Sequence, residues 1–106
     1  MHITVNNKKI KVLEYTNFID RLKSFRFYFD EIDFAIKIPK KKTINTYFFC
    51  QRVDICVTDK DNKIIKLYQN FKSEQLRFKF KGYNIYYLPL NTAKYLKIDN
   101  ILKETK

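Results

Sequence analysis

The chain has 106 residues, the length of one domain, and 45% of them are apolar, which is enough for a single core. No run approaches the roughly 18 uninterrupted apolar residues of a membrane span, and the chain opens directly into strand-like sequence rather than a signal peptide. We therefore predict one cytoplasmic domain over residues 1–106, without a transmembrane segment.

The formal net charge is +11, from 22 Lys and Arg against 11 Asp and Glu. A field of this size attracts nucleic acid, anionic lipid or an acidic protein. The charge also has a compositional explanation, because 18 of the 22 basic residues are Lys and the chain is rich in residues that A/T-rich codons specify. A nucleic-acid reader that relies on bidentate contacts is expected to use more Arg.

The N-terminal third predicts a hairpin, a short helix and a strand. Asn6 and Asn7 form a favourable turn dipeptide, and the alternation on either side predicts pairing of residues 3–5 with residues 10–13. Thr16 can cap a short amphipathic helix, since apolar residues recur after it at helical spacing. A strand over residues 34–38 is then expected to stop at Pro39.

The middle of the chain predicts two strand segments and a turn. Residues 44–49 and 53–58 are apolar strand segments, with a bulge near Gln51 and Arg52 if they form one strand. The sequence D-K-D-N at residues 59–62 has turn chemistry, and residues 63–68 are expected to return as the partner strand.

The C-terminal third contains the clearest alternation, L-R-F-K-F-K at residues 76–81, which is typical of a half-buried strand. Gly82, the only glycine, is expected to make the turn into a strand over residues 85–88, and Asn91 can cap a last helix that ends near Leu96. With one glycine, Asn and Asp must take most positive-φ positions. The pattern predicts a mainly β fold, a small antiparallel β-barrel or sandwich with two short helices.

One acid, Asp54, interrupts an apolar strand between Val53 and Ile55. Burying a lone carboxylate is costly, so such a residue usually has a partner. The segment around it reads T-I-N-T-Y-F-F-C-Q-R-V-D-I-C-V-T-D over residues 43–59. It resembles the central motif of the domain of unknown function 192 family, roughly T-x-F-M-x-x-P-I-D-x-x-F-x-D. The positions that match are Thr46, Phe48, Asp54 and Asp59.

The resemblance extends to both sides of this motif. Thr16 and Arg21 resemble the family's opening segment, and Y-Y-L-P at residues 86–89, followed by residues 91–96, resembles its closing segment. Arg52 stands where the family usually has Pro, which indicates a divergent member. The resemblance implies a small, mainly β domain from a family without an established activity. We therefore predict a non-enzymatic domain that binds an unidentified partner or small ligand.

The polar residues on the family pattern, Arg21, Thr46 and Asp54, form the candidate polar cluster. The simpler interpretation is structural, with Arg21 at the end of the first helix paired to Asp54 by bidentate hydrogen bonds. In a cleft, the same trio can bind a small polar ligand or position a proton transfer. No histidine or second well-placed carboxylate accompanies it, so we predict no catalytic residue and no cofactor.

A basic strand face provides the alternative function. If the apolar residues of segment 76–81 point into the core, three cations project together on the other side. A solvated strand face is the default interpretation, and electrostatic binding of nucleic acid is the alternative. The candidate anion-binding residues are Lys40, Lys41, Lys42, Arg77, Lys79 and Lys81.

Cysteine and acidic residues do not indicate a metal site. Cys50 and Cys56 would lie roughly 20 Å apart in one extended segment, so we predict two free thiols. His2 is the only histidine and no Cys-x-x-Cys pair exists. Asp59 and Asp61 lack the Gly and Glu of a calcium loop, so we expect them to form a turn.

Overall fold

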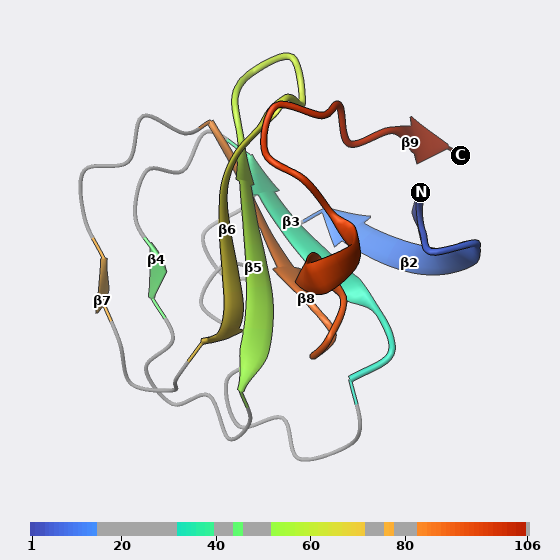
Figure 1. Ribbon diagram of the computed structural model, residues 1–106, viewed down its shortest axis with the longest axis horizontal. Coiled ribbons are helices and arrows are strands. Elements are labelled where there is room, and N and C mark those ends of the chain that lie inside the picture. Colours follow the sequence, from blue (N-terminus) through green and yellow to red (C-terminus); the bar gives the residue numbers. More distant parts are fainter. Residues whose placement is uncertain (15–31, 40–43, 46–51, 72–75, 78–82, 106) are drawn as a thin grey trace.

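The computed structural model describes residues 1–14, 32–39, 44–45, 52–71, 76–77 and 83–105 (Figure 1). Within these ranges the protein is mainly β, with a single short 3-10 turn. The strands are β1 (His2–Val5), β2 (Lys8–Glu14), β3 (Ala35–Pro39), β4 (Ile44–Asn45), β5 (Val53–Thr58), β6 (Ile64–Phe71), β7 (Leu76–Arg77), β8 (Asn84–Leu88) and β9 (Glu104–Thr105), and the turn is η1 (Ala93–Tyr95).

Seven strands form one mixed sheet in the order β6-β5-β8-β3-β2-β1-β9, and β4 pairs with β7 in a separate two-stranded ladder. Neighbours in the large sheet are antiparallel except β2 and β3, which are parallel. The prediction of an antiparallel sheet is therefore wrong at this pair. A parallel pair needs a crossover of a dozen or more residues, and residues 15–34 are long enough to make one.

The N-terminal hairpin confirms the prediction from the Asn-Asn dipeptide. Asn6 and Asn7 have φ values of 50° and 64°, the two positive angles of a type I′ turn, and Val5 pairs with Lys8 across it. All described non-glycine residues with positive φ are Asn or Asp, as expected for a chain with one glycine. The others are Asn62, Asn70, Asn91 and Asp99.

The central strands β5 and β8 are buried along their whole length, so both faces of the sheet are covered there. One face carries a cluster that includes Ile55 and Tyr87, and the other carries a cluster that includes Cys56 and Tyr86. Leu102, from the C-terminal segment, is part of the second cluster. Burial on both faces explains why β5 reads as a nearly continuous apolar run.

The finer predictions of a closed barrel or sandwich and two helices are not confirmed. In the described residues the sheet is open, since its edge strands β6 and β9 do not pair with each other. The helix expected after Thr16 lies outside the described residues. The last helix is only the turn η1, and Asn91 does not cap it, because Asn91 has a φ of 69° and Thr92 occupies the N-cap position. None of the described helical residues forms a helix long and apolar enough to cross a membrane.

Candidate functional site

Asp54 lies in the middle of β5 and is 1% exposed. Its Oδ1 accepts a hydrogen bond of 2.8 Å from the backbone N–H of Asn70, and its Oδ2 accepts one of 2.8 Å from the backbone N–H of Ala93. Each carboxylate oxygen thus has a donor, which offsets the cost of burial. The expectation that this acid is buried and has partners is confirmed, and its partners in the described part of the chain are backbone amides.

The two amides come from irregular places in the fold. The pairing of β5 with β6 shifts by one residue opposite Asp54, and Asn70, at that β-bulge, has a φ of 54°. Ala93 begins η1, whose N-cap residue Thr92 makes no side-chain capping hydrogen bond. Asp54 therefore caps this turn from the sheet and fixes the start of the segment that follows Leu88.

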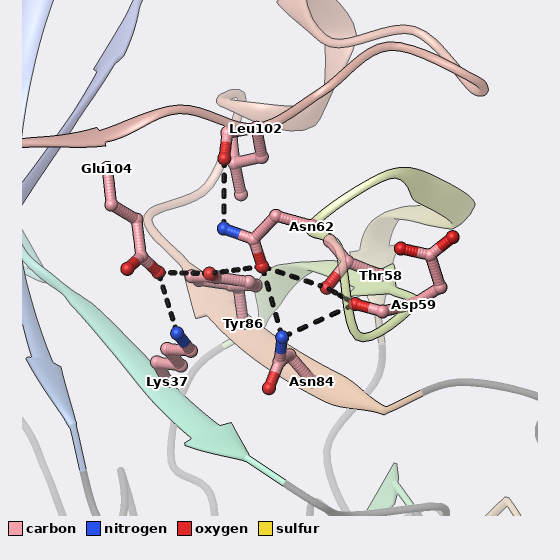
Figure 2. A network of polar contacts seen from close by, with 8 residues as sticks. All are labelled: Lys37, Thr58, Asp59, Asn62, Asn84, Tyr86, Leu102 and Glu104. Atoms are coloured by element: carbon pink, nitrogen blue, oxygen red, sulfur yellow. Dashed lines mark hydrogen bonds and ion pairs between the residues drawn. The ribbon is translucent and has the colours of Figure 1, made fainter.

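A second polar network, half-buried, lies around the turn between β5 and β6, with Asn62 at its centre (Figure 2). The Oδ1 atom of Asn62 lies 3.3 Å from the Thr58 hydroxyl, 3.0 Å from the Asn84 amide nitrogen and 3.1 Å from the Tyr86 hydroxyl. Its Nδ2 donates to the carbonyl oxygen of Leu102 at 2.9 Å. Asn62 thereby joins β5, β8 and the C-terminal segment.

Tyr86, Glu104 and Lys37 continue this network toward the C-terminus (Figure 2). The Tyr86 hydroxyl contacts Oε1 of Glu104, and Lys37 Nζ lies 3.0 Å from the same oxygen. Burial raises the pKa of Tyr86, and the hydrogen bond to Glu104 and its charge raise it further. The phenol therefore stays protonated at neutral pH and serves as a donor, not as a base.

The Glu104 carboxyl has a pKa below its ordinary value. Burial acts to raise this pKa, but the hydrogen bonds from Tyr86 and Lys37 and the charge of Lys37 outweigh it. The carboxylate is therefore ionised at neutral pH and fixes β9 to the sheet. Backbone bonds hold the same segment farther upstream, where the N–H of Leu102 donates to the Asn62 carbonyl at 2.8 Å.

The turn after β5 and the buried thiol match their predictions. Asp59 Oδ1 accepts hydrogen bonds of 2.9 Å from the N–H groups of Asp61 and Lys63, which confirms that this acidic segment forms a turn. Cys56 is a free, buried thiol, and burial raises its pKa to about 12. It is therefore an inert core residue rather than a nucleophile. Cys50 lies outside the described residues.

A basic cavity of about 370 Å³ lies between the β1–β2 hairpin and the segment that Asp54 anchors. Three exposed lysines line it, Lys8 and Lys9 from the hairpin and Lys94 from η1. Asp33 is the single carboxylate among the described lining residues. Tyr95, which is 50% exposed, also lines the cavity and provides an aromatic surface. The remaining lining residues are Val5, Asn6, Ile10, Pro89, Leu90, Asn91 and Thr92.

A second cavity, of about 310 Å³, lies under the C-terminal segment. Tyr95 lines this cavity as well as the first one, so the two are neighbours. Lys97 and Lys103 are its cations, and no described residue lining it is acidic. Ile101, which is largely exposed, contributes apolar surface.

Most of the candidate site residues singled out in the sequence lie outside the described residues. Arg21 and Thr46 lie outside the described residues, so the trio with Asp54 stays a prediction. Lys79, Lys81 and residues 40–42 also lie outside them. Arg77 is described only through its backbone, which places it in β7 opposite Ile44.

Sequence reasoning missed both cavities. Lys8 and Lys9 carry a weak signal in the sequence, since they directly follow the turn predicted at Asn6 and Asn7 and so lie at the tip of the hairpin. Lys94 and Tyr95 were expected in a helix, and nothing in the sequence indicates that the tyrosine would be left exposed. The pairing of Glu104 with Lys37 depends on tertiary structure, and no local pattern predicts it.

Comparisons with known proteins identify a similar fold and no family. No family model matches the chain, and no curated protein matches it in sequence. A crystal structure of a protein of unknown function from Novosphingobium aromaticivorans is similar, with a TM-score of 0.76, 10% identity, and coverage of 97% of this chain and 82% of that one. A crystal structure of a putative transcription regulator from Sinorhizobium meliloti gives a TM-score of 0.78 at 10% identity, covering 96% and 89% of the two chains. At this identity the likeness is one of fold.

Proposed function

We propose that the protein is a non-enzymatic binding domain that holds a small anion in the basic cavity. The observation that carries this proposal is that Lys8, Lys9 and Lys94 all line one cavity, which has a single carboxylate among its described lining residues. Its volume of about 370 Å³ lies in the range of roughly 300–1,000 Å³ that is usual for small-molecule sites.

The lining favours an anion with an apolar or planar part over a bare ion. The lysine ammonium groups supply point charges that attract phosphate or carboxylate. Tyr95 and Leu90 supply exposed apolar surface beside them. Asp54 accepts a hydrogen bond from the N–H of Ala93 and so fixes the backbone at this residue. The next two residues, Lys94 and Tyr95, therefore start from an anchored position. The site thus combines exposed charge at the hairpin tip with a segment anchored to the sheet.

A thermal-shift titration with pyrophosphate at about 50 mM salt tests this proposal. We expect pyrophosphate to stabilise the wild type, by about 2.7 kcal/mol at 100 times its dissociation constant. The cavity variant Lys8→Gln/Lys9→Gln/Lys94→Gln should lose this response. The control variant Lys60→Gln/Lys63→Gln/Lys66→Gln removes three lysines that line neither cavity and should keep it. Equal losses in both variants, or no response in the wild type, would contradict the proposal.

The family, the closure of the sheet and the location of the protein remain proposals too. Membership of the domain of unknown function 192 family is supported by the positions matched around Asp54 and by the segment at residues 86–89. A barrel or sandwich is supported by β5 and β8, which are buried on both faces and so require a second layer of structure. A cytoplasmic location agrees with the free thiol of Cys56.

Nucleic-acid binding through the strand face of residues 76–81 is the second candidate function. The net charge of +11 favours it. Replacement of Arg77, Lys79 and Lys81 by Gln should reduce the log-log salt slope for a single-stranded oligonucleotide by about 2, at about 0.7 for each phosphate neutralised. An unchanged slope would leave this face as a solvated surface.

A further inference from the structure

Tyr95 stands at the junction of the two cavities and lines both. Half of its surface is exposed, and the ammonium of Lys94 lies 5.1 Å from the centroid of its ring. An exposed tyrosine in a small domain is common and carries no meaning by itself. Its position is informative here because it lines both cavities and lysines line each of them.

The cations continue past Tyr95 into the second cavity. Lys8, Lys9 and Lys94 line the first cavity, and Lys97 and Lys103 line the second. Asp33, in the first cavity, is the one acidic residue among the described residues that line either of them. The two cavities therefore share a mainly basic lining and the aromatic ring of Tyr95.

A small anion can fill only the first cavity, so it gives no role to the lysines that line the second one. A single-stranded nucleic acid matches both cavities, because its phosphates need a row of cations and its unpaired bases stack on exposed aromatic rings. A duplex matches them less well, since its bases are already stacked within the helix. The backbone bonds of Leu102 and Asp99 to the β5–β6 hairpin hold the C-terminal side of the second cavity in place.

We infer that the two cavities form one track for single-stranded nucleic acid, in which a base stacks on Tyr95 while the lysines on both sides contact the phosphates. This inference rests on the proposed function, because the first cavity supplies the anion site at one end of the track. It adds a polymeric ligand, a stacking residue and a second set of cations.

Tyrosine variants test the stacking contact, with fluorescein-labelled 15-mers of deoxythymidine and of uridine as probes at about 50 mM salt. Tyr95→Ala should weaken binding of the oligonucleotides about 5- to 150-fold, the usual effect of losing one stacked base. Tyr95→Phe keeps the ring and should bind within about twofold of the wild type. Inorganic polyphosphate has charges but no bases, so Tyr95→Ala should leave its binding unchanged. Equal losses for polyphosphate and the oligonucleotides would overturn the stacking role and with it the inference.

Lysine variants test whether the second cavity belongs to the track. Lys97→Gln/Lys103→Gln should lower the log-log salt slope for the oligonucleotides by about 1.4, at about 0.7 for each phosphate that is no longer neutralised. The matched control Lys60→Gln/Lys66→Gln removes the same charge away from both cavities and should keep the slope. An unchanged slope in the Lys97→Gln/Lys103→Gln variant, or an equal fall in the control, would overturn the inference.

The two proposals fail in different ways. Lys97→Gln/Lys103→Gln leaves the first cavity intact and should bind pyrophosphate as the wild type does. Pyrophosphate binding without oligonucleotide binding would overturn the track and leave the small-anion site standing. Failure of the wild type to bind either probe would overturn both.

Discussion

The polar groups bonded within the fold around β5 and the lysines of the basic cavity are two regions with opposite properties. Asp54 and Asn62 have their polar atoms satisfied by the protein itself, whereas Lys8 and Lys9 project from an exposed hairpin tip. The first region determines the shape of the molecule, and the second offers charge to a ligand. The residues that stand out in the sequence thus position the site without forming its surface.

The two regions are connected through one short segment. Asp54 holds the N–H of Ala93, and the next residues, Lys94 and Tyr95, line the cavity. Substitutions inside the sheet should therefore change stability strongly, and substitutions at the cavity should change binding with little effect on stability.

The largest loss of stability is expected for Asp54→Ala. This change leaves the buried N–H of Ala93 without its acceptor, which costs about 1–3 kcal/mol, and removes a hydrogen bond from the N–H of the exposed Asn70, which costs about 0.5–1.5 kcal/mol. The free energy of unfolding should therefore fall by about 1.5–4.5 kcal/mol. Asp54→Asn keeps one acceptor oxygen and should lose less. Urea unfolding measures both, with the exposed Asp61→Ala as a control that should lie within about 0.5 kcal/mol of wild type. A similar loss in the control would break the contrast between the two regions.

Substitution of Asn62 should cause the next largest loss in the free energy of unfolding. Part of this loss comes from its side-chain hydrogen bonds and part from its backbone angle. Asn62→Gly removes the hydrogen bonds but tolerates the φ of 63°, and we expect a loss of about 1–2 kcal/mol, because Thr58 and Tyr86 each keep another acceptor. Asn62→Ala adds the cost of a left-handed residue, about 1–2 kcal/mol more. Urea unfolding of the two variants separates these contributions, and equal stabilities would show that the backbone angle is not strained.

Glu104→Gln should reduce stability in a pH-dependent way. Because the folded pKa of Glu104 lies below its ordinary value of 4.5, its stabilising effect is fully present above pH 4.5 and is lost as the pH falls through the folded pKa. At pH 7 we expect a loss of about 1.5 kcal/mol, typical of hydrogen bonds to a charged group. Urea unfolding between pH 3 and 8 should show the difference from wild type shrinking on the acid side. A difference that stays constant with pH would refute the assigned role of the carboxylate.

The smallest effect on stability is expected at the cavity. The variant Lys8→Gln/Lys9→Gln/Lys94→Gln changes exposed side chains, each of which should alter the free energy of unfolding by no more than about 0.5 kcal/mol. Its melting temperature without ligand should therefore stay close to that of wild type. A large loss of stability would mean that these lysines support the fold, and the two regions would no longer be distinct.

Local patterns predicted the elements of this fold better than its connections. The Asn6–Asn7 turn, the buried strand around Asp54 and the Asp59 turn follow from periodicity and turn chemistry, which act between neighbours in sequence. The parallel pairing of β2 with β3 depends on the path of a long crossover, which no local pattern specifies. The cap that Asp54 supplies to Ala93 is likewise a contact between distant segments.

The cavity was not predictable from sequence for a related reason. A carboxylate within an apolar strand segment stands out in the sequence and predicts a special site. An exposed lysine is common on any protein surface and predicts nothing specific. In a chain with 18 lysines, Lys8, Lys9 and Lys94 become distinctive only when the fold places them around one cavity.

The most direct test of the account is a nuclear magnetic resonance titration of the ¹⁵N-labelled protein with pyrophosphate at about 50 mM salt. The central claim is that the β1–β2 hairpin and the segment anchored by Asp54 bind an anion together. We expect the backbone amide signals of residues 5–10 and 90–95 to shift together and saturably, while those of the β5–β6 turn at residues 59–63 stay in place. Shifts concentrated outside the cavity, or the absence of saturable shifts, would contradict the claim.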